Sequence, residues 1–145
     1  MAAPTSPVRL LAGQCVCGAV HYAVEDAFVY AANCHCSACR RATGSAFKPF
    51  AGIERSKHRL VAGADHLLIF GEPDGHDLRC NLCGSYLYSV VRGGDWVHVA
   101  LGSLTDAPSL RPTEHIFVGS KAAWETITDD LPQWEGHSGD SVRLK

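Results

Sequence analysis

The stretch CHCSAC at residues 34–39 carries three cysteines, and it decides how the rest of the chain is interpreted. Two shorter cysteine clusters accompany it, CVCG at residues 15–18 and CNLCG at residues 80–84. Zinc prefers four tetrahedral ligands, and such short spacings allow one loop to supply two of them. The three clusters therefore predict a fold that is built around zinc.

A disulfide scaffold with one spare thiol is the alternative explanation of the seven cysteines. The odd count and a cysteine content below the ~8–10% of disulfide scaffolds disfavour it. The amino terminus also has neither the basic region nor the apolar region of a signal peptide. A cytoplasmic location is therefore expected, where thiols stay reduced.

Four of the cysteines make a complete ligand set. Cys80 and Cys83 have the spacing of a zinc knuckle, in which a tight turn directs both sulfurs inward. Cys15 and Cys17 present two sulfurs on one side of an extended segment. A site with four cysteine ligands has no room for chemistry, so this zinc is expected to be structural. Spacing alone leaves open which clusters pair.

The three cysteines at residues 34–39 can all reach one metal ion and leave its fourth position for water or substrate. Three protein ligands and an open position are typical of a catalytic zinc. A fourth ligand from a distant residue, such as His98 or His115, would instead make a second structural site. His35 points away from its neighbours if the segment is extended. His115 is otherwise expected to be buried and hydrogen-bonded.

Composition and charge narrow the remaining classes of protein. With 145 residues, 46% of them apolar and 19% charged, the chain suits one domain with a substantial core. The formal net charge is −2 and the pI is about 6.4, so nucleic acid is not expected as a partner. No stretch approaches the ~18–20 apolar residues that span a bilayer, so no membrane partner is expected.

Short apolar or alternating stretches, separated by glycine and proline, predict many strands and almost no helix. The expected fold class is all-β, with antiparallel sheets and both zinc loops at strand ends. One short helix is expected at residues 37–43, with Ser37 as its N-cap and Gly44 at its end. Residues from about 136 onward are polar and are expected to be loose. Strands are expected at residues 8–12, 19–24, 28–32, 47–53, 67–70, 86–91, 96–101 and 115–118.

Taken together, the motifs resemble the glutathione-dependent formaldehyde-activating family, whose domain is shared by centromere protein V. The matching segments are GQCVCGAVHY (13–22), CHCSACRRATGS (34–45), RCNLCG (79–84), VALGSL (99–104), HIFVGSKAAW (115–124) and LPQWEG (131–136). From the first segment to the last, the resemblance extends over nearly the whole chain, from about residue 11 to residue 136. The resemblance implies a zinc-binding domain over residues 11–136, between an amino-terminal tail at 1–10 and a carboxy-terminal tail at 137–145.

The resemblance also implies a tent-like antiparallel β fold and two zinc ions per chain. The family's structural zinc ligands are matched by Cys15, Cys17, Cys80 and Cys83, and its catalytic zinc ligands by Cys34, Cys36 and Cys39. The implied activity is that of a carbon–sulfur lyase, which acts on an adduct of glutathione, or another thiol, with an aldehyde, such as S-hydroxymethylglutathione. A thiol at the open zinc position would be ionised, because a metal-bound thiol is deprotonated. The rival hypothesis is a non-catalytic zinc module that carries a thiol or binds a protein partner.

Two further groups of residues have more than one interpretation. Arg40 and Arg41 could bind substrate carboxylates, or they could balance the charge of a zinc–thiolate cluster. Trp96, Trp124 and Trp134 could line a pocket, but packing in the core is the expected role.

Overall fold

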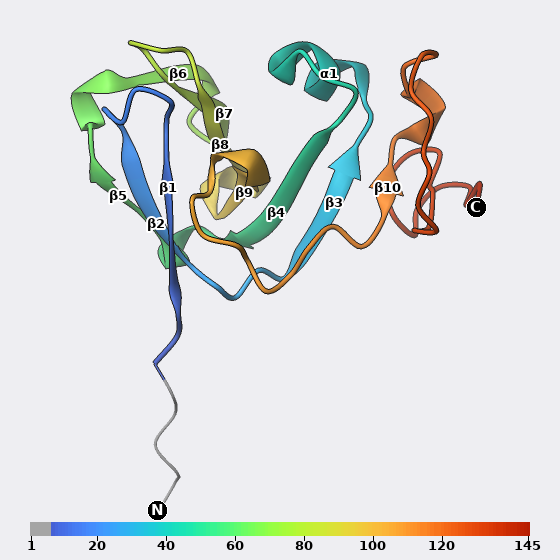
Figure 1. Ribbon diagram of the computed structural model, residues 1–145, viewed down its shortest axis with the longest axis horizontal. Coiled ribbons are helices and arrows are strands. Elements are labelled where there is room, and N and C mark those ends of the chain that lie inside the picture. The colour runs from blue at the N-terminus through green and yellow to red at the C-terminus, as the bar shows by residue number, and fades with distance from the viewer. Residues whose placement is uncertain (1–6) are drawn as a thin grey trace, which may run out of the picture.

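The computed structural model describes residues 7–145, in which strands dominate and α-helix is confined to one short segment (Figure 1). The strands are β1 (Leu10–Gln14), β2 (His21–Glu25), β3 (Tyr30–Cys34), β4 (Lys48–Glu54), β5 (His58–Ala62), β6 (Leu67–Glu72), β7 (Gly75–Cys80), β8 (Tyr86–Val91), β9 (Trp96–Ala100) and β10 (His115–Ile116). The helices are α1 (Ser37–Thr43) and the 3-10 turns η1 (Arg55–Lys57), η2 (Ala64–His66), η3 (Arg92–Gly94), η4 (Leu101–Ser103) and η5 (Val118–Ser120).

The strands form two sheets, one with the order β1-β2-β5 and a larger one with the order β10-β3-β4-β9-β8-β7-β6. All pairs are antiparallel except β10 with β3, so the predicted all-β, antiparallel fold is confirmed. The parallel pair is short, with His115 opposite Asn33 and Ile116 opposite Cys34. The sequence predicts a strand that continues to residue 118. The strand ends earlier because Phe117 takes a φ of 55°, outside strand geometry.

Several strand boundaries differ from the prediction. The helix α1 and the strand β8 have the predicted bounds, whereas β1, β2 and β3 each begin two residues later. The strands β5 and β7 were not predicted from the sequence. Their segments, HRLVA and GHDLRC, are mostly polar and partly exposed, so they lack the apolar alternation that marks a strand.

The main core lies where the small sheet packs against one face of the large sheet. In β1 and β2 every second residue is buried, which directs Leu11, Tyr22 and Val24 inward. Ile53 and Val99 meet them from the large sheet. Burial of each large apolar side chain contributes about 1.5–3 kcal/mol. This face of the large sheet packs into the main core, so the opposite face is the one that is available for a binding site.

A smaller apolar cluster on that opposite face contains Ala32, Cys34, Phe50 and Ile116. The carboxy-terminal residues cover its far side, where they lie next to β10 (Figure 1). The sequence predicts a loose tail at 137–145, but these residues return along 133–136 as a hairpin. The Glu135 N–H donates to the carbonyl of Val142 at 2.8 Å, and residues 134 and 143 form a bridge.

The three tryptophans have different environments. Trp124 is 72% exposed, so the expectation of core packing is wrong for this residue. Trp96 stacks on Tyr30 with ring centroids 5.8 Å apart, and Trp134 packs against the smaller cluster.

The expected amino-terminal tail at 1–10 falls partly outside the described residues, which begin at residue 7. Residues 7–9 have no regular structure, and β1 starts at residue 10. Within the described part of the chain, every helix is too short or too polar to cross a bilayer.

Candidate functional site

The first cysteine cluster has the geometry of a closed zinc site. The sulfurs of Cys15, Cys17, Cys80 and Cys83 all lie within 4.8 Å of one another. The Cys15 and Cys17 sulfurs are 3.6 Å apart, and those of Cys17 and Cys80 are 3.7 Å apart. Tetrahedral Zn–S bonds of about 2.3 Å separate sulfurs by about 3.8 Å, so the four residues fit a zinc ion. One pair follows β1 and the other joins β7 to β8, so the cluster links the two sheets.

Local hydrogen bonds favour the ionised form of Cys15 and Cys83, whereas the pKa of Cys17, which shares protons with them, is raised to about 12. The N–H of Val20 donates to the sulfur of Cys15 at 3.2 Å, and the N–H of Leu82 lies 3.4 Å from the sulfur of Cys80. The hydroxyl of Ser85, 3.1 Å from the Cys83 sulfur, lowers the pKa of that thiol to about 5. A thiolate is the form that binds metal, so the surroundings of the cluster suit a metal ligand set.

The second cluster, formed by Cys34, Cys36 and Cys39, lies where β3 ends and α1 begins. Its three sulfurs also lie within 4.8 Å of one another. Cys36, rather than the predicted Ser37, is the N-cap of α1, because its sulfur accepts the N–H of Cys39 at 3.2 Å. Gly44 ends the helix in the left-handed conformation, as predicted. The helix cap and the cluster are therefore one local structure.

The thiols of the second cluster share protons. The hydrogen bond from Cys34 lowers the pKa of Cys39 to about 6, and the same interaction raises the pKa of Cys34. The positive charge of Lys48 also lowers the pKa of Cys39. Cys39 therefore ionises more readily than an ordinary thiol, which favours the form that binds a metal ion.

No histidine joins the second cluster within residues 7–145. His35 is fully buried and turns away, with its Nε2 2.8 Å from Nδ1 of His115. His115 is 2% exposed and contacts the Asp129 carboxylate through Nε2 at 2.9 Å, so the prediction of a buried, hydrogen-bonded histidine is confirmed. His98 instead lies 2.6 Å from the hydroxyl of Tyr30. In the described structure the second cluster thus has three protein donors.

Lys48 lies beside the second cluster, and no motif in the sequence had pointed to this residue. It is the cross-strand partner of Cys34, so both side chains lie on the same face of the sheet. The side chain is 9% exposed and makes no ion pair within the described residues. Its Nζ donates to the Tyr86 hydroxyl at 3.2 Å and lies 5.6 Å from the centroid of Phe50. Burial alone would lower the pKa of Lys48, but Tyr86 and Cys39, which are negative when ionised, hold it above its ordinary value.

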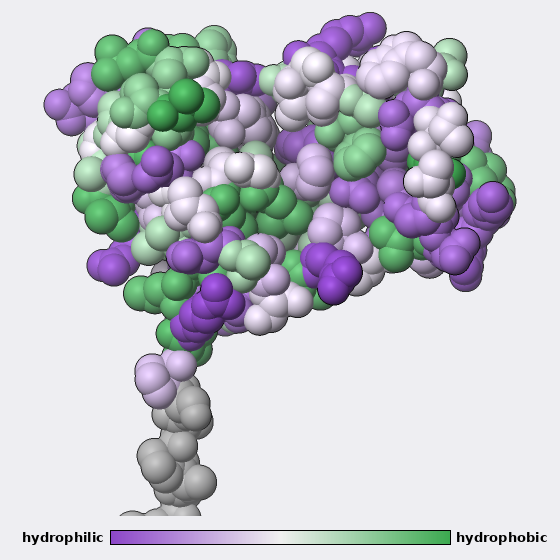
Figure 2. Space-filling model, in the orientation of Figure 1, coloured by the Kyte–Doolittle hydropathy of each residue, from purple (hydrophilic) through white to green (hydrophobic). Residues whose placement is uncertain are grey.

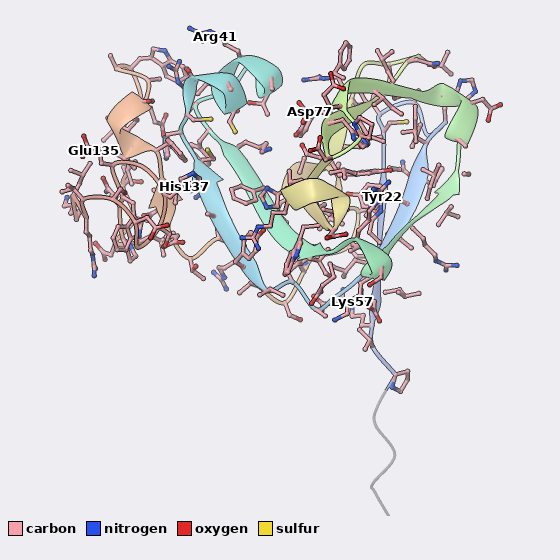
Figure 3. The ribbon with its side chains drawn as sticks, turned by 180° about the vertical axis from the view of Figure 1, so that it is seen from behind. Tyr22, Arg41, Lys57, Asp77, Glu135 and His137 are labelled. Atoms are coloured by element: carbon pink, nitrogen blue, oxygen red, sulfur yellow. The ribbon has the colours of Figure 1, made fainter. Side chains whose placement is uncertain are left out.

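An irregularity in β8 brings Tyr86 to this face. The pairing of β7 with β8 shifts register between Leu78 and Arg79, which leaves one extra residue in β8. Tyr86 and Ser89, which are three residues apart, therefore point to the same side, and their hydroxyls form a hydrogen bond. The Ser89 hydroxyl donates to Asp77 at 2.7 Å (Asp77 is labelled in Figure 3). The result is a polar row that runs from Asp77 to Lys48.

Two cavities lie near the second cluster, and none of its three cysteines lines either of them. A cavity of about 330 Å³ lies between the α1–β4 segment and the loops next to the first cluster, and its lining includes Thr43, Lys48 and Tyr86. Figure 2 shows the surface hollowed between the α1 part of the molecule and the β6–β7 part. The lining of a second cavity, of about 590 Å³, includes Ala32 and Phe50, which form the next cross-strand pair after Cys34–Lys48 on the same face of the sheet.

The arginines predicted from the sequence lie on the rim of α1. Arg41 is exposed and points away from the sheet (Figure 3), and neither it nor Arg40 is among the residues that line the two cavities. The Nε of Arg40 is buried and has no hydrogen-bond partner in the described chain. Arg79, which the sequence did not single out, lines the smaller cavity and hydrogen-bonds the carbonyls of Ala42 and Gly84.

Comparison with known proteins agrees with this geometry. The family model described as glutathione-dependent formaldehyde-activating enzyme matches residues 10–120. A Halomonas elongata protein named for the same family is 32% identical over an alignment of 128 residues, and the match covers 81% of each chain. The crystal structure of a Rhodobacter sphaeroides protein is similar with a TM-score of 0.55 and 30% identity, and the match covers 68% of this chain and 91% of that one. All seven cysteines lie within the matched range, and the chain belongs to the glutathione-dependent formaldehyde-activating enzyme family.

Proposed function

We propose that the protein is a zinc-dependent carbon–sulfur lyase, which forms or cleaves an adduct between a thiol and an aldehyde. The family name indicates glutathione and formaldehyde as the substrates, and their adduct is S-hydroxymethylglutathione. One observation carries the proposal. A cluster of three cysteines has no fourth protein donor in the described structure, and it lies beside Lys48, whose buried ammonium group makes no ion pair there.

The residues divide into two metal sites with different roles. Cys15, Cys17, Cys80 and Cys83 would hold a structural zinc ion. Cys34, Cys36 and Cys39 would hold a second zinc ion, which supplies an open position where a bound thiol is ionised at neutral pH. In this proposal the two roles differ because the first cluster has four protein donors and the second has three.

The reaction requires no electron donor or acceptor. In the direction of synthesis the thiol sulfur forms a bond with the carbonyl carbon, and the π electrons of the carbonyl move to its oxygen. The proton that the thiol loses to solvent is replaced by one that solvent gives to this oxygen. Cleavage reverses each change, so atoms and charge balance in both directions.

Lys48 is positioned to stabilise the oxygen as its negative charge develops. An ammonium group has three N–H donors, and Tyr86 accepts one of them. The remaining donors are available to an aldehyde in the smaller cavity, which Lys48 and Tyr86 line. A charge-assisted hydrogen bond in a site shielded from water stabilises such an oxygen more than it stabilises the neutral aldehyde.

Arg40 and Arg41 stay candidates for contact with substrate carboxylates. Their position on the rim of α1 supports a contact at the mouth of the site more than one inside it. The rival hypothesis, a zinc module without turnover, requires the same cysteines but no role for Lys48.

Zinc content, thiol binding and turnover test the proposal in that order. We expect two zinc ions per chain, and we expect glutathione to change the absorption of cobalt at one of the two sites. We also expect equilibration of formaldehyde with S-hydroxymethylglutathione, followed by NMR exchange, to be faster than without protein. Lys48→Met should lower the catalysed rate about 100-fold, with Lys57→Met, an exposed lysine on η1, as the matched control. Unchanged cobalt absorption together with no catalysed exchange would contradict the enzyme and favour the module.

A further inference from the structure

The larger cavity has no part in the roles assigned so far. It lies between the sheet face formed by β3, β4 and β9 and the carboxy-terminal hairpin, and its volume of about 590 Å³ suits a ligand of several hundred daltons. Tyr30, Phe50 and His98 form its floor. His137, labelled in Figure 3, lines it from the hairpin, on the side that faces β3.

Arg92 places an unpaired cation at this cavity. Its guanidinium carbon lies 5.0 Å from the ring centroid of Tyr30 and 4.9 Å from that of Trp96. In the described part of the chain no carboxylate lies within 4.0 Å of it, and its side chain donates no hydrogen bond. A guanidinium held against aromatic rings keeps its N–H edge free, which is the edge that binds carboxylates in pairs of hydrogen bonds.

The floor of the cavity is rigid. The hydroxyl of Tyr30 lies 2.6 Å from Nε2 of His98, and the His98 ring lies 4.5 Å from the centroid of Phe50. Burial and the nearby cations lower the pKa of His98 to about 4, so this imidazole is neutral at pH 7. Arg92 is therefore the permanently charged cation among the residues that line the cavity.

Two carboxylates, those of Glu114 and Asp140, also line the larger cavity. Glu114 is fixed because its Oε2 accepts hydrogen bonds from Nε1 of Trp134 at 2.9 Å and from the hydroxyl of Ser138 at 2.8 Å. Asp140, on the hairpin, also lines the cavity. The cavity thus presents a cation from η3 and carboxylates from the residue before β10 and from the hairpin. This arrangement is complementary to a ligand that carries both a carboxylate and an ammonium group.

The position of the cavity sets the size of that ligand. Tyr30, under the Arg92 guanidinium, precedes Cys34 on the same face of β3 by a distance of about 13 Å at ~3.3 Å per residue. A ligand with its sulfur at the three-cysteine cluster and a carboxylate at Arg92 must therefore extend about 10 Å. Free cysteine is too short for this span, whereas a short peptide is long enough.

We propose that the larger cavity binds the charged, non-reacting part of the thiol substrate, with Arg92 as the anchor for a carboxylate and Glu114 and Asp140 facing an ammonium group. The cavity would then select zwitterionic peptide thiols against neutral thiols. The inference rests on the proposed function for the place of the sulfur.

Binding of S-methylglutathione to the zinc-loaded protein, measured by calorimetry, tests the cavity without any reaction at the sulfur. We expect Arg92→Gln to weaken this binding 10- to 100-fold, because a charge-assisted pair of hydrogen bonds is lost. Arg92→Lys should restore part of it, and Arg59→Gln, at an exposed arginine on the small sheet, should leave it unchanged. The diethyl ester of S-methylglutathione should bind the unaltered protein as weakly as S-methylglutathione binds Arg92→Gln.

The outcomes separate this inference from the proposed function. Equal binding of S-methylglutathione by wild type and Arg92→Gln, or equal binding of the acid and its ester, overturns the assignment of the cavity even where turnover is intact. Arg92-dependent binding in a protein that shows no turnover supports the cavity and overturns the lyase. A protein that does not bind S-methylglutathione at all overturns the cavity assignment. Circular dichroism and the thermal midpoint of each variant establish that it is folded.

Discussion

Loss of one cysteine should have very different consequences in the two clusters. Cys83→Ser would remove a ligand from the cluster that joins β1 to the β7–β8 turn, whereas Cys36→Ser acts within residues 34–39. A metal ion that links Cys17 to Cys80, 63 residues apart, closes a long loop, and the loop entropy corresponds to about 4 kcal/mol. Closure of the short loop 34–39 corresponds to about 2 kcal/mol by the same relation.

The difference should be visible in the free energy of unfolding. For a chain of 145 residues that free energy is on the order of 7–20 kcal/mol, so a loss of about 4 kcal/mol is a substantial fraction of it. We expect urea unfolding of the zinc-loaded proteins, followed by tryptophan fluorescence, to show a lower midpoint for Cys83→Ser than for Cys36→Ser. Metal analysis of both variants should show that each holds less zinc than the wild type.

The comparison between the two variants is its own control, because the substitution is chemically the same. If Cys36→Ser unfolds at the same urea concentration as Cys83→Ser, the separation into a structural and a reactive cluster is wrong. If neither variant changes the midpoint, metal binding does not contribute to the stability of the fold.

Three other substitutions test the packing and the buried histidines. A Cβ at Gly52 would lie 2.2 Å from Cζ of Tyr30, so Gly52→Ala should displace that ring. We expect urea titrations to show a free energy of unfolding that is lower by about 1–3 kcal/mol. An unchanged free energy would show that the ring adapts. Burial lowers the pKa of His58 to about 4, below the ~6.5 of the unfolded chain, so its contribution to stability is complete above pH 6.5 and is lost as the pH falls towards 4. The fall in urea midpoint between pH 7 and pH 5 should thus be smaller in His58→Phe than in the wild type. An equal fall in the two proteins would contradict this contribution of His58 to the pH dependence of stability. Asp129→Ala removes the partner of buried His115 and should cost about 1–3 kcal/mol, measured in the same way against Asp130→Ala; equal stability of the two variants would count against the contact.

The sequence was most informative where structure is set by near neighbours. The helix at 37–43 and the strand at 86–91 have the predicted bounds, because a capped short helix and an apolar run each carry their signal locally. The division of the cysteines into a group of four and a group of three also agrees with the sulfur positions, but the spacing left the pairing of the clusters open and the resemblance to the family implied it.

The features that were missed depend on partners across the sheet. β5 and β7 are polar strands that are held by their neighbours, and nothing in their own residues marks them. Lys48 lies next to the three-cysteine cluster because it is opposite Cys34, and this register could not be deduced from the sequence. Tyr86 reaches the same face only because of a register shift in β8, which reverses the side predicted by simple alternation.

The separation in sequence between contacting residues also affects how the protein folds. β10 pairs with β3 through His115 and Asn33, which are 82 positions apart, and Cys17 and Cys80 of the four-cysteine cluster are 63 positions apart. Folds dominated by such distant pairs reach their native state in milliseconds to seconds, because the entropy of loop closure opposes each pairing. During that interval the cysteines are separated and open to oxidants and to other metals. Refolding in the presence of a thiol reductant and zinc should therefore give a higher yield of active protein than refolding in air.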